Sequence, residues 1–234
     1  MSTLLEITGL SKDYQGLRPL RIASLVVRPG DVLSIGGLDA AAAETFVHVM
    51  TGATLPDAGD VTLFGQDTRA ITDSKAWLNT LDGMGMISAR GILIDAFSVL
   101  QNIAMSLTLE VDPIDPQVLP KVGELAREAG IDAGAFDLPV GNAGAGVTMR
   151  VHVARAVALG ARLLVAEHPS AALPRDAVAA FGADLARVAR GRGIALVAIT
   201  ADDVLAKAIG GQRLELVPAT GELKASGFLR KLFG

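Results

Sequence analysis

Apolar residues along this chain form short runs that are separated by longer segments with helical periodicity. Several runs have the length and composition of β-strands: residues 4–7, 20–27, 32–35, 84–87, 163–166, 194–199 and 213–217. The intervening segments predict helices at residues 40–50, 118–129, 176–190 and 202–209, and a helix followed by a turn at residues 70–82. This alternation predicts an α/β fold.

Residues 28–67 read in order as strand, loop, helix, turn and strand. The apolar run 32–35 is followed by Gly36 and Gly37, and the helix that comes next ends before Gly52. A strand that leads through glycines into a helix is the frame of a phosphate-binding loop, because the helix N-terminus offers free N–H groups to an anion. Candidate chemistry therefore lies between residues 36 and 45.

The segments RPGDVLSI and TGATLPDAGDVTLFGQD, on either side of that loop, resemble those of the ATP-binding subunits of ABC transporters. The resemblance extends over residues 4–227, in the family's order and spacing. It implies a P-loop NTPase-like ABC ATPase fold in one domain, residues 1–234, with an antiparallel β subdomain and an α-helical subdomain at about residues 90–158. The segments FSVLQNIAMSL and AEHPSAAL look most like the short subunits of lipoprotein- or lipid-handling systems.

The loop itself departs from the family's G-x-x-G-x-G-K-S-T. Counting back from Gly52 places that motif from Gly37 to Thr45, so that the phosphate-gripping lysine corresponds to Ala43 and the magnesium-binding hydroxyl to Glu44. Losing the lysine's hydrogen bond costs roughly 1.5–3 kcal/mol, and a carboxylate about 4 Å from a phosphate adds about 1–4 kcal/mol of repulsion. We expect an affinity for ATP that is lower by about 10²–10⁵-fold.

Alanines replace glycines in this loop, so the helix is expected to begin earlier than in the family. Asp39 is the predicted N-cap, and its carboxylate would take helix-end N–H groups that a phosphate would otherwise use. Three further positions follow from the resemblance. Tyr14 lies where the family stacks an aromatic ring on adenine, although local packing of this side chain is an equal alternative. The glutamine that senses magnesium corresponds to Ala89, and the histidine that contacts the γ-phosphate to Ala201.

The two catalytic acids of the family are altered as well. They correspond to Glu167 and His168, and we expect His168 to be a structural residue with satisfied hydrogen bonds rather than a base. The signature L-S-G-G-Q, which caps the nucleotide of the opposite subunit, corresponds to the segment containing Gly144, Ala145 and Gly146. Its serine is replaced, but backbone N–H groups at the start of this helix could still face an anion. No catalytic residue and no metal site is expected.

The resemblance also implies a surface for a permease, beside the segment that follows residue 87. Ile92, Leu93 and Phe97 are the candidate contacts, with packing in the core as the alternative for at least half of the apolar residues there. Residues 228–234 form an apolar stripe that could dock on a partner or on their own domain. Because half of the chain is hydrophobic and 20% is charged, we expect an apolar surface suited to a stable partner, or else an alanine-rich core.

Composition narrows the possibilities further. The net charge is −4 and the basic residues are scattered, which argues against nucleic acid as a partner. The absence of cysteine excludes disulfides and thiolate sites. The sequence has no apolar run of the roughly 20 residues that cross a bilayer, and its first residues do not resemble a signal peptide. We expect a cytoplasmic protein that reaches the inner face of the cytoplasmic membrane through its partners.

These observations leave three hypotheses about function. The first is a catalytically silent ABC subunit that pairs with a permease, and with a second, intact ATPase subunit or another copy of itself. It would need no cofactor and would bind ATP and magnesium only weakly, if at all. The second is a working ATP-hydrolysing transporter subunit with unusual residues. The third is a free-standing scaffold or regulator that has left transport.

Overall fold

The computed structural model describes residues 3–225. The first strands of the chain belong to a four-stranded antiparallel sheet. Its order is β2 (Leu20–Val27), β1 (Leu5–Lys12), β4 (Ala58–Leu63) and β5 (Gln66–Asp67). Leu5 and Ile7 alternate with exposed residues and point into the core, which is the pattern of a sheet with one solvated face. β1 is longer than the predicted strand at residues 4–7, because it continues past an irregularity between Thr8 and Ser11.

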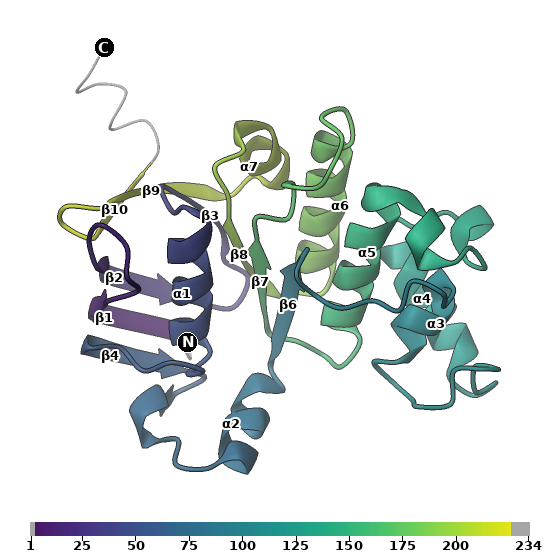
Figure 1. The fold of residues 1–234 in the computed structure, drawn as a ribbon, viewed down its shortest axis with the longest axis horizontal. Coiled ribbons are helices and arrows are strands. Elements are labelled where there is room, and N and C mark those ends of the chain that lie inside the picture. The colour runs from purple at the N-terminus through teal and green to yellow at the C-terminus, as the bar shows by residue number, and fades with distance from the viewer. Residues whose placement is uncertain (1–2, 226–234) are drawn as a thin grey trace.

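A six-stranded sheet forms the centre of the molecule, in the order β10, β9, β3, β8, β7, β6 (Figure 1). β9, β3, β8, β7 and β6 run parallel, and β10 pairs antiparallel with β9. β7 and β8 are buried along their whole length, as expected of strands covered on both faces. The bounds are β3 (Val32–Gly36), β6 (Met84–Ser88), β7 (Leu163–Glu167), β8 (Ala195–Ile199), β9 (Gln212–Val217) and β10 (Glu222–Ala225).

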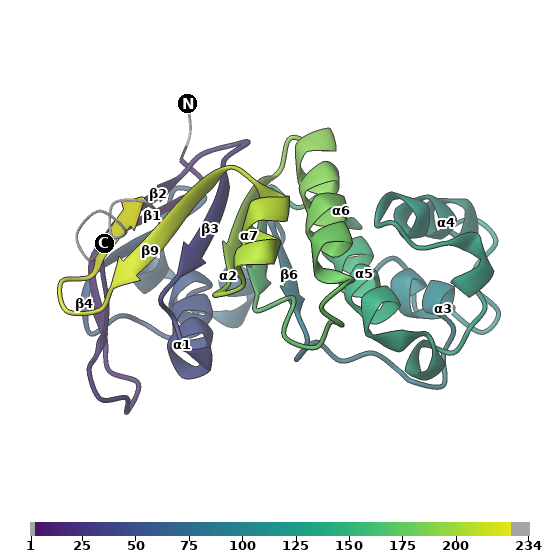
Figure 2. The same cartoon turned by 90° about the horizontal axis from the view of Figure 1, so that it is seen from above.

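Helices cover this sheet on both faces, and in two perpendicular views α5 and α6 lie between the sheet and the pair α3 and α4 (Figures 1 and 2). One hydrophobic core joins α1 and the antiparallel sheet to one face of the central sheet. The other core joins the opposite face to the remaining large helices. The bounds are α1 (Ala40–Met50), α2 (Ser74–Leu81), α3 (Val99–Ala104), α4 (Leu119–Glu128), α5 (Gly144–Val157), α6 (Val178–Gly191) and α7 (Asp203–Ile209).

Capping residues explain where several helices begin. The helix and turn predicted at residues 70–82 are present, but the helix begins later, at Ser74. Thr68–Ala70 is a separate turn of 3₁₀ helix, and Asp73 caps α2 by accepting a hydrogen bond from the N–H of Ala76. Ser98 caps α3 within a capping box. Among residues 3–225, no helix is long and apolar enough to span a bilayer. The apolar stripe at residues 228–234 lies outside the described part of the chain.

Candidate functional site

The start of α1 and the ends of β6 and β7 meet at one edge of the central sheet (Figure 1). β6 and β7 are parallel, with Ser88 opposite Glu167, so both strands deliver their last residues to the same place. β3 leads through Gly36 and Gly37 into α1, as the sequence predicted. The segments that the resemblance assigned to phosphate and metal binding are therefore neighbours in space.

Asp39 caps α1, which confirms the predicted early start of this helix. Its Oδ1 accepts a hydrogen bond of 2.8 Å from the N–H of Ala42, and its carbonyl accepts another of 2.8 Å from Ala43. Gly37 has a φ of 81°, and a Cβ there would lie 2.8 Å from the carbonyl oxygen of Leu216, so the turn before the cap requires glycine. The helix end that could attract an anion thus already holds a carboxylate.

The next residues of α1 do not offer groups that bind a phosphate. Ala43, at the position of the phosphate-gripping lysine, is fully buried in the core that α1 shares with the antiparallel sheet. The hydroxyl of Thr45 donates a hydrogen bond of 2.8 Å to the carbonyl of Ala41 within the same helix. Glu44 is the residue of this turn whose side chain extends outward, with 47% of it exposed.

Arg90 joins the predicted positions to one another, and the sequence analysis had not singled it out. Its Nη2 donates a hydrogen bond of 2.5 Å to Oε2 of Glu167, and its Nη1 pairs with Oε1 of Glu44. Glu167 is 6% exposed, whereas the side chains of Arg90 and Glu44 are each 47% exposed. One guanidinium therefore lies between the carboxylate of α1 and the carboxylate at the end of β7.

Electrostatics keeps Arg90 charged. Burial is the largest single influence and lowers the Arg90 pKa, but the hydrogen bond and charge of Glu167, together with Glu44, outweigh it and leave the pKa raised. The only sequence signal for this arrangement was an arginine beside Ala89, with carboxylates at two positions where the resembling family handles a cation.

His168 follows Glu167 in a sharp turn. Its φ is 40°, its backbone N–H donates a hydrogen bond of 2.9 Å to the carbonyl of Ile199, and its own carbonyl accepts from Ala171. The expectation of a fully hydrogen-bonded histidine is wrong, because this turn holds the ring where Nε2 is buried and meets no partner among the described residues. Ala201 is exposed just beyond β8 and carries no group that could contact a phosphate.

Tyr14 packs against its own loop. A Cβ at Gly16 would lie 2.6 Å from Cζ of the Tyr14 ring, so the ring covers that glycine closely. Burial raises the Tyr14 pKa, and the charge of Asp39 adds to the effect. The ring also borders a hollow of about 400 Å³ that includes Glu44 and His48, so stacking on a base stays a prediction beside the observed local packing.

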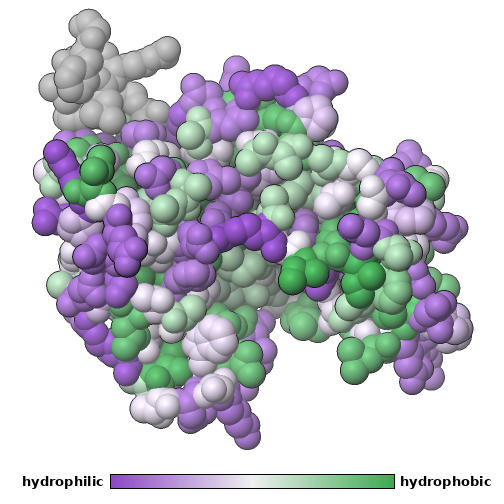
Figure 3. All heavy atoms as spheres, in the orientation of Figure 1, coloured by the Kyte–Doolittle hydropathy of each residue, from purple (hydrophilic) through white to green (hydrophobic). Residues whose placement is uncertain are grey.

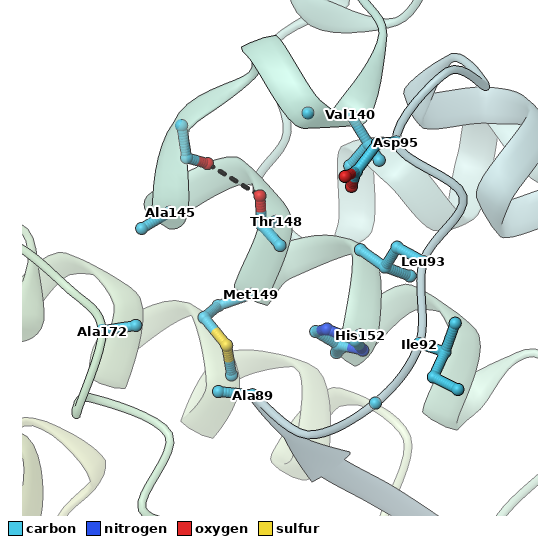
Figure 4. A pocket seen from close by; sticks show the side chains of 13 residues that line it. Ala89, Ile92, Leu93, Asp95, Val140, Ala145, Thr148, Met149, His152 and Ala172 are labelled. Carbon is cyan, nitrogen blue, oxygen red and sulfur yellow. Dashed lines mark hydrogen bonds between the residues drawn. The ribbon is translucent and has the colours of Figure 1, made fainter.

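A pocket of about 480 Å³ opens between the loop that follows β6 and the first turns of α5 (Figure 4). Ala89, one of the predicted nucleotide-binding residues, and Gly144 and Ala145 of the predicted signature segment all line it. The carbonyl of Gly144 accepts a hydrogen bond of 3.0 Å from the hydroxyl of Thr148, and no side chain caps the start of α5. Gly146 is the neighbour whose carbonyl accepts from Arg150 at 3.0 Å.

His152 lines this pocket beside the loop (Figure 4). Its ring is almost completely buried, and a Cβ at Gly91 would lie 2.8 Å from its Cε1. Burial lowers the His152 pKa from the ordinary 6.5, and the charge of Arg155 lowers it further. The imidazole therefore packs as a neutral group against the loop.

The three predicted permease contacts differ in exposure. Ile92 is 84% exposed, whereas Leu93 packs in part against the hydrophobic core and Phe97 is half-buried. In the space-filling view, hydrophobic atoms gather where the ribbon draws the loop between β6 and α3, beside a hollow (Figure 3). A hollow of about 400 Å³ there includes exposed apolar side chains from four segments, Leu78, Met86, Ile92 and Leu159.

Comparison with known proteins gives matches in sequence and in structure, although no family model matches the chain. The lipoprotein-releasing system ATP-binding protein LolD of Geobacter metallireducens is 28% identical over 214 residues, which are 90% of this chain and 94% of that protein. The xylose import ATP-binding protein XylG of Pseudomonas fluorescens is 30% identical over 84% of this chain, which spans only 38% of that longer protein.

Two solved structures share the fold. CbiO1 of Clostridium perfringens, described as part of the ABC transporter complex cbiONQ, superposes with a TM-score of 0.79 at 18% identity, covering 100% of this chain and 91% of its own. The ATP-binding cassette MJ0796, in a post-hydrolysis state with ADP and Pi, gives a TM-score of 0.73 at 19% identity over 94% of this chain and 96% of its own. The predicted α/β cassette fold is confirmed.

Proposed function

We infer that this chain, which belongs to the ATP-binding subunits of ABC transporters, serves in a transport complex without hydrolysing ATP itself. Its whole length, residues 1–234, would act as one domain, with the helical part near residues 90–158. The observation that carries the proposal is the position of Arg90. Its guanidinium is held between Glu44 and Glu167, the residues at the expected magnesium-binding and catalytic positions.

ATP with magnesium requires positive charge and hydrogen-bond donors around its phosphates. Here the lysine position is the buried methyl group of Ala43, and the hydroxyl position is the carboxylate of Glu44. Asp39 adds a second carboxylate by taking an N–H group at the start of α1. The residues present do not fit a bound magnesium nucleotide, and we derive no catalytic step from them.

The residues at the end of β7 do not supply a general base either. Glu167 is held by Arg90, and the Nε2 of His168 is buried without a partner that would orient it. A general base must reach the proton that it removes, directly or through one water molecule. Neither side chain has such access in the described residues, which supports the catalytically silent reading.

The partners of such a subunit would be a permease and either a second, intact ATPase subunit or another copy of this chain. The exposed Ile92, with Leu93 and Phe97 behind it, would contact the permease, and the hollow beside Leu78 and Leu159 would receive part of it. The chain would then lie at the inner face of the cytoplasmic membrane. The likeness to a lipoprotein-releasing protein over 94% of its length supports a system that handles lipids or lipoproteins.

A working ATPase is the second candidate, and one observation favours it. The cassette MJ0796, which shares this fold, is described in a post-hydrolysis state with ADP and Pi. Against it stand the replaced lysine and hydroxyl positions. A free-standing scaffold is the third possibility, and it predicts that no membrane protein is recovered with the chain.

Titration of the purified chain with labelled ATP and magnesium tests the proposal. We expect no saturable binding at micromolar ATP and no turnover above background. Millimolar Mg-ATP should leave the melting temperature nearly unchanged, because a ligand stabilises a protein only well above its dissociation constant. Glu167→Gln and His168→Ala serve as matched controls. Turnover in the unmodified chain that disappears in either variant would overturn the proposal and support the working ATPase.

A further inference from the structure

The loop at residues 89–97, between β6 and α3, is attached to its surroundings in two directions. We propose that Arg90 is a positioning residue that holds this loop in one place without any bound ligand, and so presents its apolar residues to a partner. The part that concerns the partner rests on the function proposed above. The part that concerns the loop can be tested on the isolated chain.

Attachments on one side come from the helical region. The carbonyl of Ile92 accepts a hydrogen bond of 2.8 Å from Nη1 of Arg155 on α5. The side-chain amide of Asn102 on α3 accepts from the N–H of Ile94 at 2.8 Å and donates to its carbonyl at 3.1 Å. The carbonyl of Asp95 accepts from the N–H of Gly141 at 3.1 Å. These contacts fix the second half of the loop to the helices.

Arg90 makes the connection in the other direction, to α1 through Glu44 and to β7 through Glu167. A guanidinium is planar and donates along fixed directions, so two carboxylates on separate elements determine its orientation more strictly than one would. The backbone next to it is confined as well. The N–H of Gly91 donates to the carbonyl of Ser88 at 3.0 Å, and Gly91 lies so close to the His152 ring that a side chain would not fit.

Burial indicates that this connection is more than an ordinary surface ion pair. The Arg90–Glu44 arm is half-exposed on both sides, and such pairs contribute little. The Arg90–Glu167 arm ends on a carboxylate that is only 6% exposed, and a buried charge without a partner is strongly unfavourable. Moving the loop so that Arg90 leaves Glu167 is therefore energetically unfavourable. Ile92, two residues further on, is 84% exposed in this position of the loop.

Hydrogen exchange on the full chain measures whether Arg90 positions the loop. In Arg90→Gln we expect the amides of Gly91, Ile94 and Phe97 to exchange about ten- to hundredfold faster, as for the loss of one charge-assisted hydrogen bond. Arg28→Gln is the matched control, since Arg28 is an exposed arginine in the turn before β3, and it should leave these amides unchanged. Arg90→Lys should give intermediate rates, because an ammonium does not span both carboxylates with fixed geometry.

Salt dependence separates a charge effect from a general packing effect. Raising the salt concentration to about 1 M shortens the screening length to about 3 Å. This should weaken the half-exposed Arg90–Glu44 arm, whereas the arm to the buried Glu167 is screened much less, so the three amides should exchange only slightly faster in the unmodified chain and stay unchanged in Arg90→Gln. Equal exchange in Arg90→Gln and the unmodified chain would overturn the proposal. Faster exchange spread over the whole of Arg90→Gln would also overturn it, because Arg90 would then support overall stability and not the loop.

Recovery of partners with the tagged chain in mild detergent tests the remaining part. We expect Arg90→Gln to recover less permease than Arg28→Gln does. Equal recovery would show that the fixed loop does not serve the partner surface, and would overturn that part. If the unmodified chain recovers neither a permease nor an ATPase, the proposed function fails, while the exchange experiment still decides the role of Arg90 in the loop.

Discussion

Glutamine substitutions in the Arg90 bridge should reveal two arms of unequal strength. Glu167→Gln and Glu44→Gln each remove one negative charge and keep the shape of the side chain. The bridge joins Arg90 to a carboxylate that is 6% exposed on one side and to one that is 47% exposed on the other. The free energy of unfolding should therefore fall more in Glu167→Gln than in Glu44→Gln.

The expected magnitudes come from that burial. For Glu44→Gln we expect a loss of at most about 0.2–1 kcal/mol, as for an exposed ion pair. For Arg90→Gln we expect about 1.5–3 kcal/mol, the range for hydrogen bonds to charged groups. This is below the roughly 3–5 kcal/mol for breaking a fully buried pair, because Arg90 is itself half-exposed. The double variant Arg90→Gln, Glu167→Gln should lose less than the sum of its two single variants, since it leaves no unpaired buried charge.

Urea denaturation of the four variants and the unmodified chain gives these free energies. Urea is preferable to guanidinium chloride, because the salt of the latter would screen the interaction under study. Arg28→Gln again controls for the loss of an exposed arginine. Equal losses for Glu44→Gln and Glu167→Gln, or strictly additive losses in the double variant, would refute the account of the bridge given above.

Three further outcomes are expected. Ala43→Lys should lower the free energy of unfolding by about 1–3 kcal/mol in urea denaturation, because it overfills a buried position, and labelled ATP should still not bind; tight binding by this variant would contradict the site description. Stability should fall as the pH drops below about 6.5, because the folded-state pKa of His152 is lowered and the unfolded chain takes up a proton first; His152→Gln should flatten this slope, and an unchanged slope would assign it elsewhere. Asp39→Ala should cost about 0.5–2 kcal/mol through the lost helix cap, while Asp39→Ser should retain nearly all of it; equal losses in thermal or urea melts would argue against a capping role.

Most of the fold could be predicted from the sequence because its signals are local. β8 is apolar throughout, β7 is apolar up to Glu167, and their neighbouring helices have helical periodicity, so each segment's own pattern predicts its structure. The strand β10 was not predicted. The segment Glu222–Ala225 has only four residues, two of them charged. It becomes a strand through pairing with β9, which a local sequence pattern does not contain.

In the candidate site, too, the features set by neighbouring residues could be predicted and those set by distant residues could not. The early start of α1 could be predicted because the cap of Asp39 acts on residues next to it. The bridge could not, because Arg90 and Glu167 are 77 residues apart and meet only after β6 and β7 have paired. The unpartnered Nε2 of His168 could not be predicted either, because the backbone of His168 is hydrogen-bonded to Ile199, which is distant in the sequence.

The bridge also bears on how the family's nucleotide-binding motif could be introduced into this chain. A lysine at Ala43 alone would enter a buried position, a hydroxyl in place of Glu44 would leave Arg90 with one carboxylate, and a change of Arg90 would leave Glu167 bare. Each single change toward the family's motif is therefore expected to lower stability before any ATP is bound. Natural proteins lie close to the stability that their function needs, so selection removes such intermediates. If the chain is catalytically silent as proposed, a return to nucleotide binding would need several of these changes together.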